Sequence, residues 1–226
     1  MQEISTVIRE RILADSGNYF ANDNIAKYIK PGDLDLLIDE VTEKMEVVLK
    51  ALVINTEDDH NTQDTARRVS KMWISEVFRG RYINKPEIRY FPNAKKVNSM
   101  YVTGPITVRS CCSHHLVPFI GTAYVGVVPG DEVVGLSKFN RLIDWVFSRP
   151  QIQEEALIEI ADTLEHELRP KGLGVVVTAQ HHCMTWRGVK DKSVFTNSEL
   201  RGCMYNDPAA REEFMALINM NMEYKQ

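Results

Sequence analysis

The segment MYVTGPITVRSCCSHHLVPFIGTAYVGVVPGDEVVGL (residues 100–136) is rich in branched and aromatic side chains that favour β-strands. Turn-forming residues such as Pro105 and Pro129-Gly130 divide it into short runs. The runs expected to form strands are Met100–Thr103, Ile106–Ser110, Phe119–Val128 and Val133–Leu136. Because no helical pattern lies between them, they favour an antiparallel sheet over alternating βαβ units.

Helices are predicted on both sides of this segment, from apolar residues at helical spacing and from capping or breaking residues. In chain order they are Asp33–Leu52, about Thr65–Arg79 with Gly80 as its stop, Ser137–Phe147, a helix with Pro150 in its first turn and Pro170 after its end, and a short helix after Pro208. Ile88–Phe91 predicts a further short strand, and Gly172–Trp186 predicts a long one. Strands and helices in segregated runs predict the α+β class.

Composition limits what the chain can do. Its 226 residues are 44% hydrophobic and 26% charged, which is typical of a globular protein. The formal net charge of -4 argues against a broad electrostatic binding surface for nucleic acid or for an anionic membrane. With no signal-peptide pattern and no run of about 18 apolar residues, the chain is expected to be cytoplasmic. In that reducing compartment the four cysteines favour metal ligands, catalytic groups or core packing over disulfides.

Four of the six histidines form two adjacent pairs, and each pair lies beside a cysteine. The clusters are Cys111-Cys112-Ser113-His114-His115 and His181-His182-Cys183. Thiolate and imidazole are the ligands that zinc prefers. Cys112 and His115 in one turn, with Cys183 from a distant strand, would leave a fourth position open for water, as in a catalytic zinc site.

Strand alternation adds an expectation for the second cluster. If Gly172–Trp186 is one strand, His181, Cys183, Thr185 and Arg187 share a face and His182 points away. That face would present a metal ligand, a titratable imidazole and a cation together. The plainer interpretation, as core or surface positions, is kept for Cys111, Cys203, His60 and His166.

Charged residues outside these clusters are weaker signals. Lys138 and Arg141 lie three apart near the start of an expected helix, where helix amides and two cations suit a polyphosphate. Arg67, Arg68 and Lys71 form a second basic group, and Glu154 alone is typical of a first-turn helix acid.

Taken together, the motifs resemble the GTP cyclohydrolase I family. The resemblance rests on Cys112-Ser113-His114-His115-Leu116-Val117-Pro118-Phe119, Gly135-Leu136-Ser137-Lys138 with Arg141, Arg149-Pro150-Gln151-Ile152-Gln153-Glu154, and His181-His182-Cys183 with Arg187-Gly188. It covers about Leu34 to Ile218. It implies the tunnelling (T-) fold, an antiparallel sheet backed by helices that joins between subunits into an oligomeric barrel. Residues 1–32 are then an N-terminal extension, 33–82 a helical region and 83–226 the T-fold catalytic domain.

The resemblance also implies an activity. The family hydrolyses GTP at C8 of the guanine ring with water activated at zinc, releases formate and recloses the chain to 7,8-dihydroneopterin triphosphate. This is a first step toward pterins and folate, or toward deazapurines. Cys112, His115 and Cys183 would hold one zinc ion per subunit, while His181 and His114 would transfer protons at the guanine imidazole and at the ribose.

The same carry-over assigns the substrate-binding residues and the assembly. Glu154 would recognise guanine. The residues expected at the ribose and triphosphate are Ser137, Lys138, Arg141, Arg187 and Arg68, the last contributed by a neighbouring subunit. The resemblance implies a homodecamer with shared active sites, and neither nucleic acid nor membrane as a partner.

Some positions depart from the family pattern, and two rival interpretations stay open. The departures are Ser113, Glu155, Ala66 and the segment 196–202, which bear on the choice between GTP and dGTP.

One rival is an enzyme of the same fold acting on a pterin or deazaguanine. The other is a non-catalytic zinc-stabilised or regulatory module, which would leave His114 and His181 unexplained. Nucleic-acid binding is a distant third.

Overall fold

The computed structural model describes residues 2–223, which form two compact units that divide between Asn84 and Lys85. In the described part of the chain, no helix combines the length and the apolar character that a membrane crossing requires.

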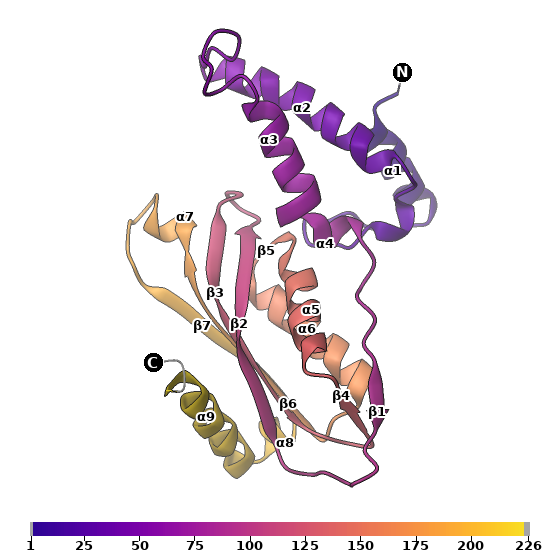
Figure 1. Cartoon of the computed structure of the whole chain (residues 1–226), viewed down its shortest axis with the longest axis vertical. Helices are drawn as coiled ribbons and strands as arrows, with labels where there is room; N and C mark the ends of the chain where they lie inside the picture. The colour runs from indigo at the N-terminus through magenta and orange to yellow at the C-terminus, as the bar shows by residue number, and fades with distance from the viewer. Residues whose placement is uncertain (1, 224–226) are drawn as a thin grey trace. The chain divides into compact units, whose positions relative to one another are not determined.

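The N-terminal unit is helical (Figure 1). Its elements are α1 (Ile4–Ala14), the 3-10 turn η1 (Ala26–Tyr28), α2 (Asp33–Ala51), α3 (Thr65–Met72), the π-helical turn η2 (Trp73–Val77) and α4 (Arg79–Tyr82). The helix predicted from Asp33 is therefore present. The expected stop at Gly80 is wrong, because the Phe78 amide donates to the Trp73 carbonyl at 2.8 Å in a wide turn and the chain continues helically through Gly80.

Residues 1–32, for which no helix was expected, contain α1. Ile8 and Ile12 are buried in a small apolar cluster with Ile25. Polar contacts tie α1 to α2: the Ser5 amide donates to Glu40 at 2.9 Å, and Arg11 forms an ion pair with the buried Asp33. A few apolar positions with two specific polar contacts therefore hold this helix in place.

The C-terminal unit contains the sheets (Figure 1). Its elements are β1 (Tyr90–Pro92), β2 (Tyr101–Cys112), β3 (Pro118–Val128), β4 (Glu132–Val134), α5 (Ser137–Phe147), β5 (Pro150–Gln151), α6 (Gln153–Leu168), β6 (Gly172–His181), α7 (His182–Thr185), β7 (Val194–Gly202), α8 (Cys203–Asn206) and α9 (Pro208–Glu223). The α+β class is thus confirmed.

The main sheet has the order β5-β2-β3-β6-β7, and a separate two-stranded sheet joins β1 to β4. In the main sheet all pairs are antiparallel except β2 with β5. The runs expected at 100–103 and 106–110 are one strand, β2, whose pairing with β3 shifts register between Thr103 and Ile106.

The expectation that Pro150 opens a helix is wrong. Pro150 and Gln151 form β5 and pair in parallel with Cys111 and Cys112 at the end of β2. Proline lacks an amide hydrogen but is tolerated at a sheet edge. Helix α6 therefore begins only at Gln153.

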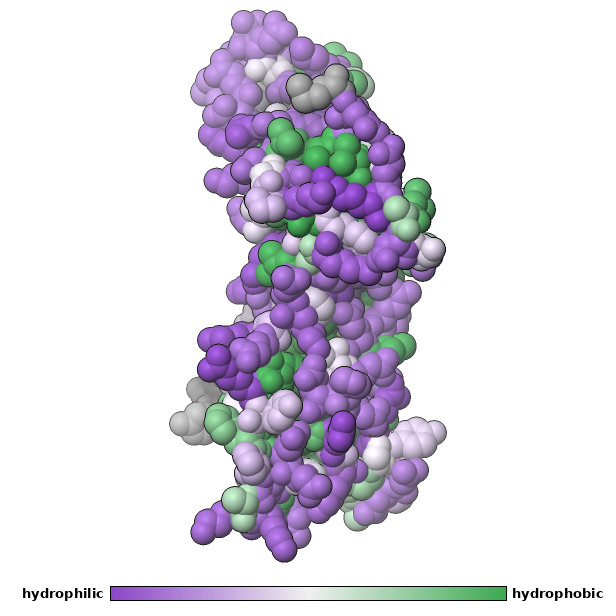
Figure 2. Space-filling model, turned by 90° about the vertical axis from the view of Figure 1, so that its right-hand side faces the viewer, coloured by the Kyte–Doolittle hydropathy of each residue, from purple (hydrophilic) through white to green (hydrophobic). Residues whose placement is uncertain are grey.

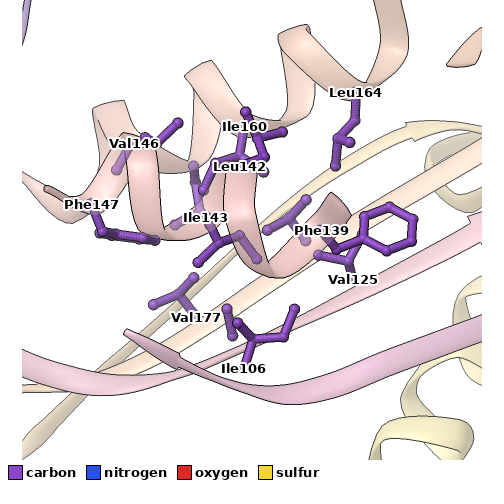
Figure 3. Close-up of a cluster of buried hydrophobic side chains, with 14 of the residues drawn as sticks. Ile106, Val125, Phe139, Leu142, Ile143, Val146, Phe147, Ile160, Leu164 and Val177 are labelled. Atoms are coloured by element: carbon purple, nitrogen blue, oxygen red, sulfur yellow. The ribbon is translucent and has the colours of Figure 1, made fainter. Parts of the chain in front are cut away.

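One face of the sheet packs against α5 and α6. Alternate residues such as Val125 and Val177 are fully buried on this face against Phe139, Ile143 and other side chains of the two helices (Figure 3). Fully burying each such side chain contributes about 1.5–3 kcal/mol, so this layer is the main core of the unit.

The opposite face packs against α9. Phe214 of α9 lies over Gly126 and Gly174, which are register partners on β3 and β6. A Cβ atom on Gly126 or Gly174 would lie 2.4 or 2.6 Å from the Phe214 ring. The paired glycines therefore form the flat seat on which this ring packs, beside Tyr124 and Val176.

Candidate active site

The two cysteine–histidine clusters meet at one end of the main sheet. Cys112 ends β2, His115 follows in the turn, and Cys183 lies in α7. One ligand atom from each of these residues lies within 4.8 Å of the other two. The Cys112 amide closes the turn by donating to the Val117 carbonyl at 2.9 Å. Within this turn, the Cys-x-x-His spacing brings the side chains of Cys112 and His115 close to each other and to Cys183.

The second cluster reaches this point through a bend in the chain. The predicted strand to Trp186 is wrong, because β6 ends at His181 and residues 182–185 form the helical turn α7. Cys183, Thr185 and Arg187 therefore do not share a face by strand alternation. Two contacts accompany the bend: the Trp186 amide donates to the His182 carbonyl at 3.0 Å within α7, and His182 Nδ1 lies 3.1 Å from the carbonyl oxygen of Pro118 on β3.

The three side chains fit a zinc ion by their donor chemistry. Cys112 is buried and Cys183 is half-buried. Burial raises the pKa of the Cys183 thiol because it disfavours the charged thiolate. The nearby Cys112 raises it further because two thiolates would repel each other. A divalent cation reverses that cost, and two thiolates with one imidazole are a donor set suited to zinc. Three protein ligands also leave a coordination position for a small molecule.

A cavity of about 330 Å³ opens beside this group. Its lining residues are Cys112, His114, Gln151, Ile152, Gln153, Glu154, His181, Cys183, Met184, Ser193, Val194 and Phe195. The cavity therefore brings two of the candidate metal ligands together with three further residues singled out from the sequence, namely His114, His181 and Glu154.

His181 is held tightly on one side of the cavity. Its ring stacks on Phe119, with ring centroids 4.7 Å apart, and the Phe195 ring meets it edge-on at 5.9 Å. His181 Nε2 lies 3.0 Å from Gln153 Oε1. Burial lowers the pKa of His181, the negative charge of Glu154 opposes this shift, and His182 adds to it.

Glu154 reaches the cavity because β5 is anchored at both ends. The Ser113 amide donates to the Gln151 carbonyl at 3.1 Å, which joins β5 to the turn that contains Cys112 and His115. Arg149, just before β5, is fully buried and donates to both carboxylate oxygens of Glu159 on α6, at 2.7 and 2.8 Å. The first turn of α6, with the exposed Glu154, is thereby fixed next to Cys112.

The residues predicted to bind phosphate lie in three different places. Ser137, Lys138 and Arg141 occupy the first turns of α5, and the described lining of the cavity includes none of the three. Exposed Arg187 lies with its Nη1 2.9 Å from His115 Nε2. Arg68 belongs to the N-terminal unit, on α3, where it pairs with Asp64 at 3.4 Å.

Sequence reasoning missed several residues of the cavity. Gln153 and the Ser193–Phe195 segment line it, and Phe119 supports His181 from beneath. Phe119 and His181 are register partners on β3 and β6, so their contact depends on strand pairing between distant segments. In the sequence, the one indication that Gln153 belongs to the site is its position directly before Glu154.

Comparison with known proteins identifies the family of this chain. The family model described as GTP cyclohydrolase I matches residues 41–219. A GTP cyclohydrolase 1 of Flavobacterium johnsoniae is 32% identical over 95% of this chain and 98% of its own length. A GTP cyclohydrolase 1 of Brevibacillus brevis is 41% identical over 80% of this chain and 97% of its own.

A third relative, a GTP cyclohydrolase 1 of Vibrio cholerae, is 36% identical over 78% of this chain and 82% of its own length. The matched region includes both cysteine–histidine clusters, the cavity lining and the first turns of α5. The resemblance drawn from the motifs is therefore confirmed, and the chain is an enzyme that belongs to the GTP cyclohydrolase I family.

Proposed function

We propose that this enzyme converts GTP to 7,8-dihydroneopterin triphosphate with release of formate, and that it does so with one zinc ion per subunit. The observation that carries the proposal is the meeting of Cys112, His115 and Cys183 beside a cavity that also contains His114, His181 and Glu154. The product class would enter the biosynthesis of pterins and folate, or of deazapurines.

Cys112, His115 and Cys183 would hold the metal. A bound zinc ion supplies an activated water at neutral pH, through its effect on the water pKa. The protein contributes the cavity, whose lining includes the apolar residues Ile152, Val194 and Phe195 beside the polar side chains.

His181 and His114 would carry the protons. His181 is held by two aromatic rings, one stacked and one edge-on, and burial lowers its pKa, which favours the neutral ring that can accept a proton. His114 lies in the exposed turn after Cys112 and lines the same cavity, where it could serve the opening ribose. Two imidazoles in one cavity suit a reaction that moves several protons.

Glu154 would select the base. A carboxylate accepts two hydrogen bonds from a guanine edge, whereas adenine would leave one oxygen facing an acceptor. Ser137, Lys138, Arg141 and Arg187 would hold the ribose and triphosphate, with Arg68 supplied by a neighbouring subunit. Arg187 already contacts His115, so a triphosphate held there would lie close to the candidate metal ligands.

We further propose the T-fold and assembly into a decameric barrel. Strand β7 lies at an edge of the main sheet, and a long unpaired edge is a template for pairing with another chain. Large apolar side chains are exposed nearby, including Trp186 at 72% and Val189 at 73%. Figure 2 shows that the face it presents is mostly polar, with separate apolar patches. Burial of such residues between subunits would offset their exposure in the single chain.

The test is turnover of zinc-loaded protein with GTP and with dGTP, followed by formate and by the fluorescent pterin formed on oxidation. Both products are expected from GTP and are expected to vanish in Cys183→Ala and His181→Ala. The matched controls are Cys203→Ala and His166→Ala, which lie outside the cavity and should keep the wild-type rate. Absence of formate from zinc-bound, intact protein would reject the proposal in favour of a non-catalytic zinc module.

A further inference from the structure

Gln153 is a fully buried amide that connects His181 to two oxygen acceptors. It is the first residue of α6 and is 0% exposed. Its Nε2 lies 3.1 Å from the Val177 carbonyl oxygen and 2.6 Å from Asn197 Oδ1. Its Oε1 lies 3.0 Å from His181 Nε2. Three elements, β6, β7 and α6, therefore meet at this one side chain.

The direction of these hydrogen bonds follows from chemistry alone. A backbone carbonyl such as that of Val177 can only accept, so the Gln153 atom facing it must be the amide nitrogen. The Gln153 oxygen then faces His181 and can only accept. His181 must therefore carry a hydrogen on Nε2, and in the neutral ring the lone pair is left on Nδ1.

The ring cannot escape this arrangement by turning over. A half-turn would exchange Nε2 with a carbon atom and would leave the buried Gln153 oxygen without a donor, which is unfavourable. Phe119 holds the ring plane from below with an interplanar angle of 9°, and Phe195 blocks its edge. Ring plane and tautomer are therefore set by different neighbours.

We propose that Gln153, anchored by Val177 and Asn197, is a positioning residue that fixes the tautomer of His181, so that His181 exchanges protons with the substrate through Nδ1 alone. This inference rests on the proposed function, because it assumes that His181 handles protons in the reaction. It assigns to Gln153 and Asn197 a role that does not require either side chain to touch the reacting atoms.

The first measurement is ¹⁵N magic-angle-spinning NMR of the zinc-loaded full chain at about pH 8, with the His181 signals assigned by their loss in His181→Ala. The expected spectrum has a protonated Nε2 and a bare Nδ1. In Gln153→Met, which keeps the side-chain length but removes the acceptor, both tautomers should appear. A wild-type spectrum with the hydrogen on Nδ1 would overturn the proposal.

Kinetics with GTP supply the second readout. Gln153→Met is expected to lower kcat about 10- to 100-fold, with the KM for GTP and the zinc content unchanged. Gln153→Glu keeps an acceptor toward His181, and its second oxygen can donate to the Val177 carbonyl only as the protonated acid. The acid form should therefore recover part of that loss. The matched control is Gln180→Met, the same substitution one residue before His181 on the other face of β6.

The outcomes separate this inference from the function on which it rests. Wild-type kcat in Gln153→Met would overturn the positioning role. If that variant does not fold, the wild-type spectrum and the Gln153→Glu rate decide the question. No formate from the wild type would reject the proposed function, while the spectrum would still report the tautomer.

Discussion

Asp33 is a buried carboxylate, 6% exposed, in the N-terminal unit. Burial works to raise its pKa, but the hydrogen bonds from the Arg11 guanidinium and the Lys30 amide outweigh burial and hold the pKa below its usual value. A folded-state pKa below the unfolded value of about 3.9 means that the carboxylate stabilises the fold at all higher pH values. That contribution is lost as the pH falls through the folded-state pKa.

We therefore expect Asp33→Asn to lower the free energy of unfolding by about 2 kcal/mol at pH 7. Below the folded-state pKa the difference between the two proteins should shrink, because both side chains are then neutral. Urea unfolding at pH 7 and at the lowest pH that keeps the protein soluble measures both values. A gap of equal size at the two pH values would contradict the role given to the ionised carboxylate.

Glu154 allows a test of base recognition. Glu154→Gln keeps the size of the side chain but replaces one acceptor oxygen with a donor. We expect kcat/KM for GTP to fall about 100-fold, since a donor would face the guanine N–H groups. The neighbouring exposed Glu155→Gln is the control, and an equal effect of both substitutions would remove Glu154 from base selection.

At the scale of elements, the glycine seat under α9 allows a stability prediction. In Gly174→Ala the new Cβ would meet the Phe214 ring, so α9 must shift outward. We expect a loss of about 1–3 kcal/mol in the free energy of unfolding. Gly135→Ala, where a Cβ would meet no atom within 4 Å, should change it by about 0.5 kcal/mol or less. Thermal unfolding of the two variants measures the contrast, and equal values would mean that α9 is not seated by these glycines.

Helices and strands whose apolar residues repeat with a clear period could be predicted from the sequence. Elements that depend on contacts with distant segments could not. Strand β3 and helices α2 and α5 follow from alternation and helical spacing within each segment. β5 exists only because Cys111 and Cys112 pair with it, and α7 bends away from β6 where His182 contacts Pro118. The candidate metal ligands could be predicted because cysteine and histidine at this spacing have few other uses, whereas the role proposed for Gln153 depends on its contacts with β6 and β7.

At the scale of the molecule, the proposal of shared active sites predicts complementation. Arg68→Ala and His181→Ala should each be inactive alone, since each removes one half of every site. Mixed assemblies made by co-expression contain sites with an intact Arg68 from one subunit and an intact His181 from the next. Formate release should therefore return to a fraction of the wild-type rate. If the mixture stays inactive while its mass matches the wild-type assembly, both residues act within one chain.

The convergence of Cys112, His115 and Cys183 has a consequence beyond catalysis. The first two lie before α5 and α6 in the chain and the third lies after them, so a shared ion would act as a removable cross-link around that whole segment. Closing such a long loop lowers the entropy of the unfolded chain, and the unfolded chain offers no preformed site for the ion. A chelator would then lower the free energy of unfolding, even at positions of the chain far from the cavity.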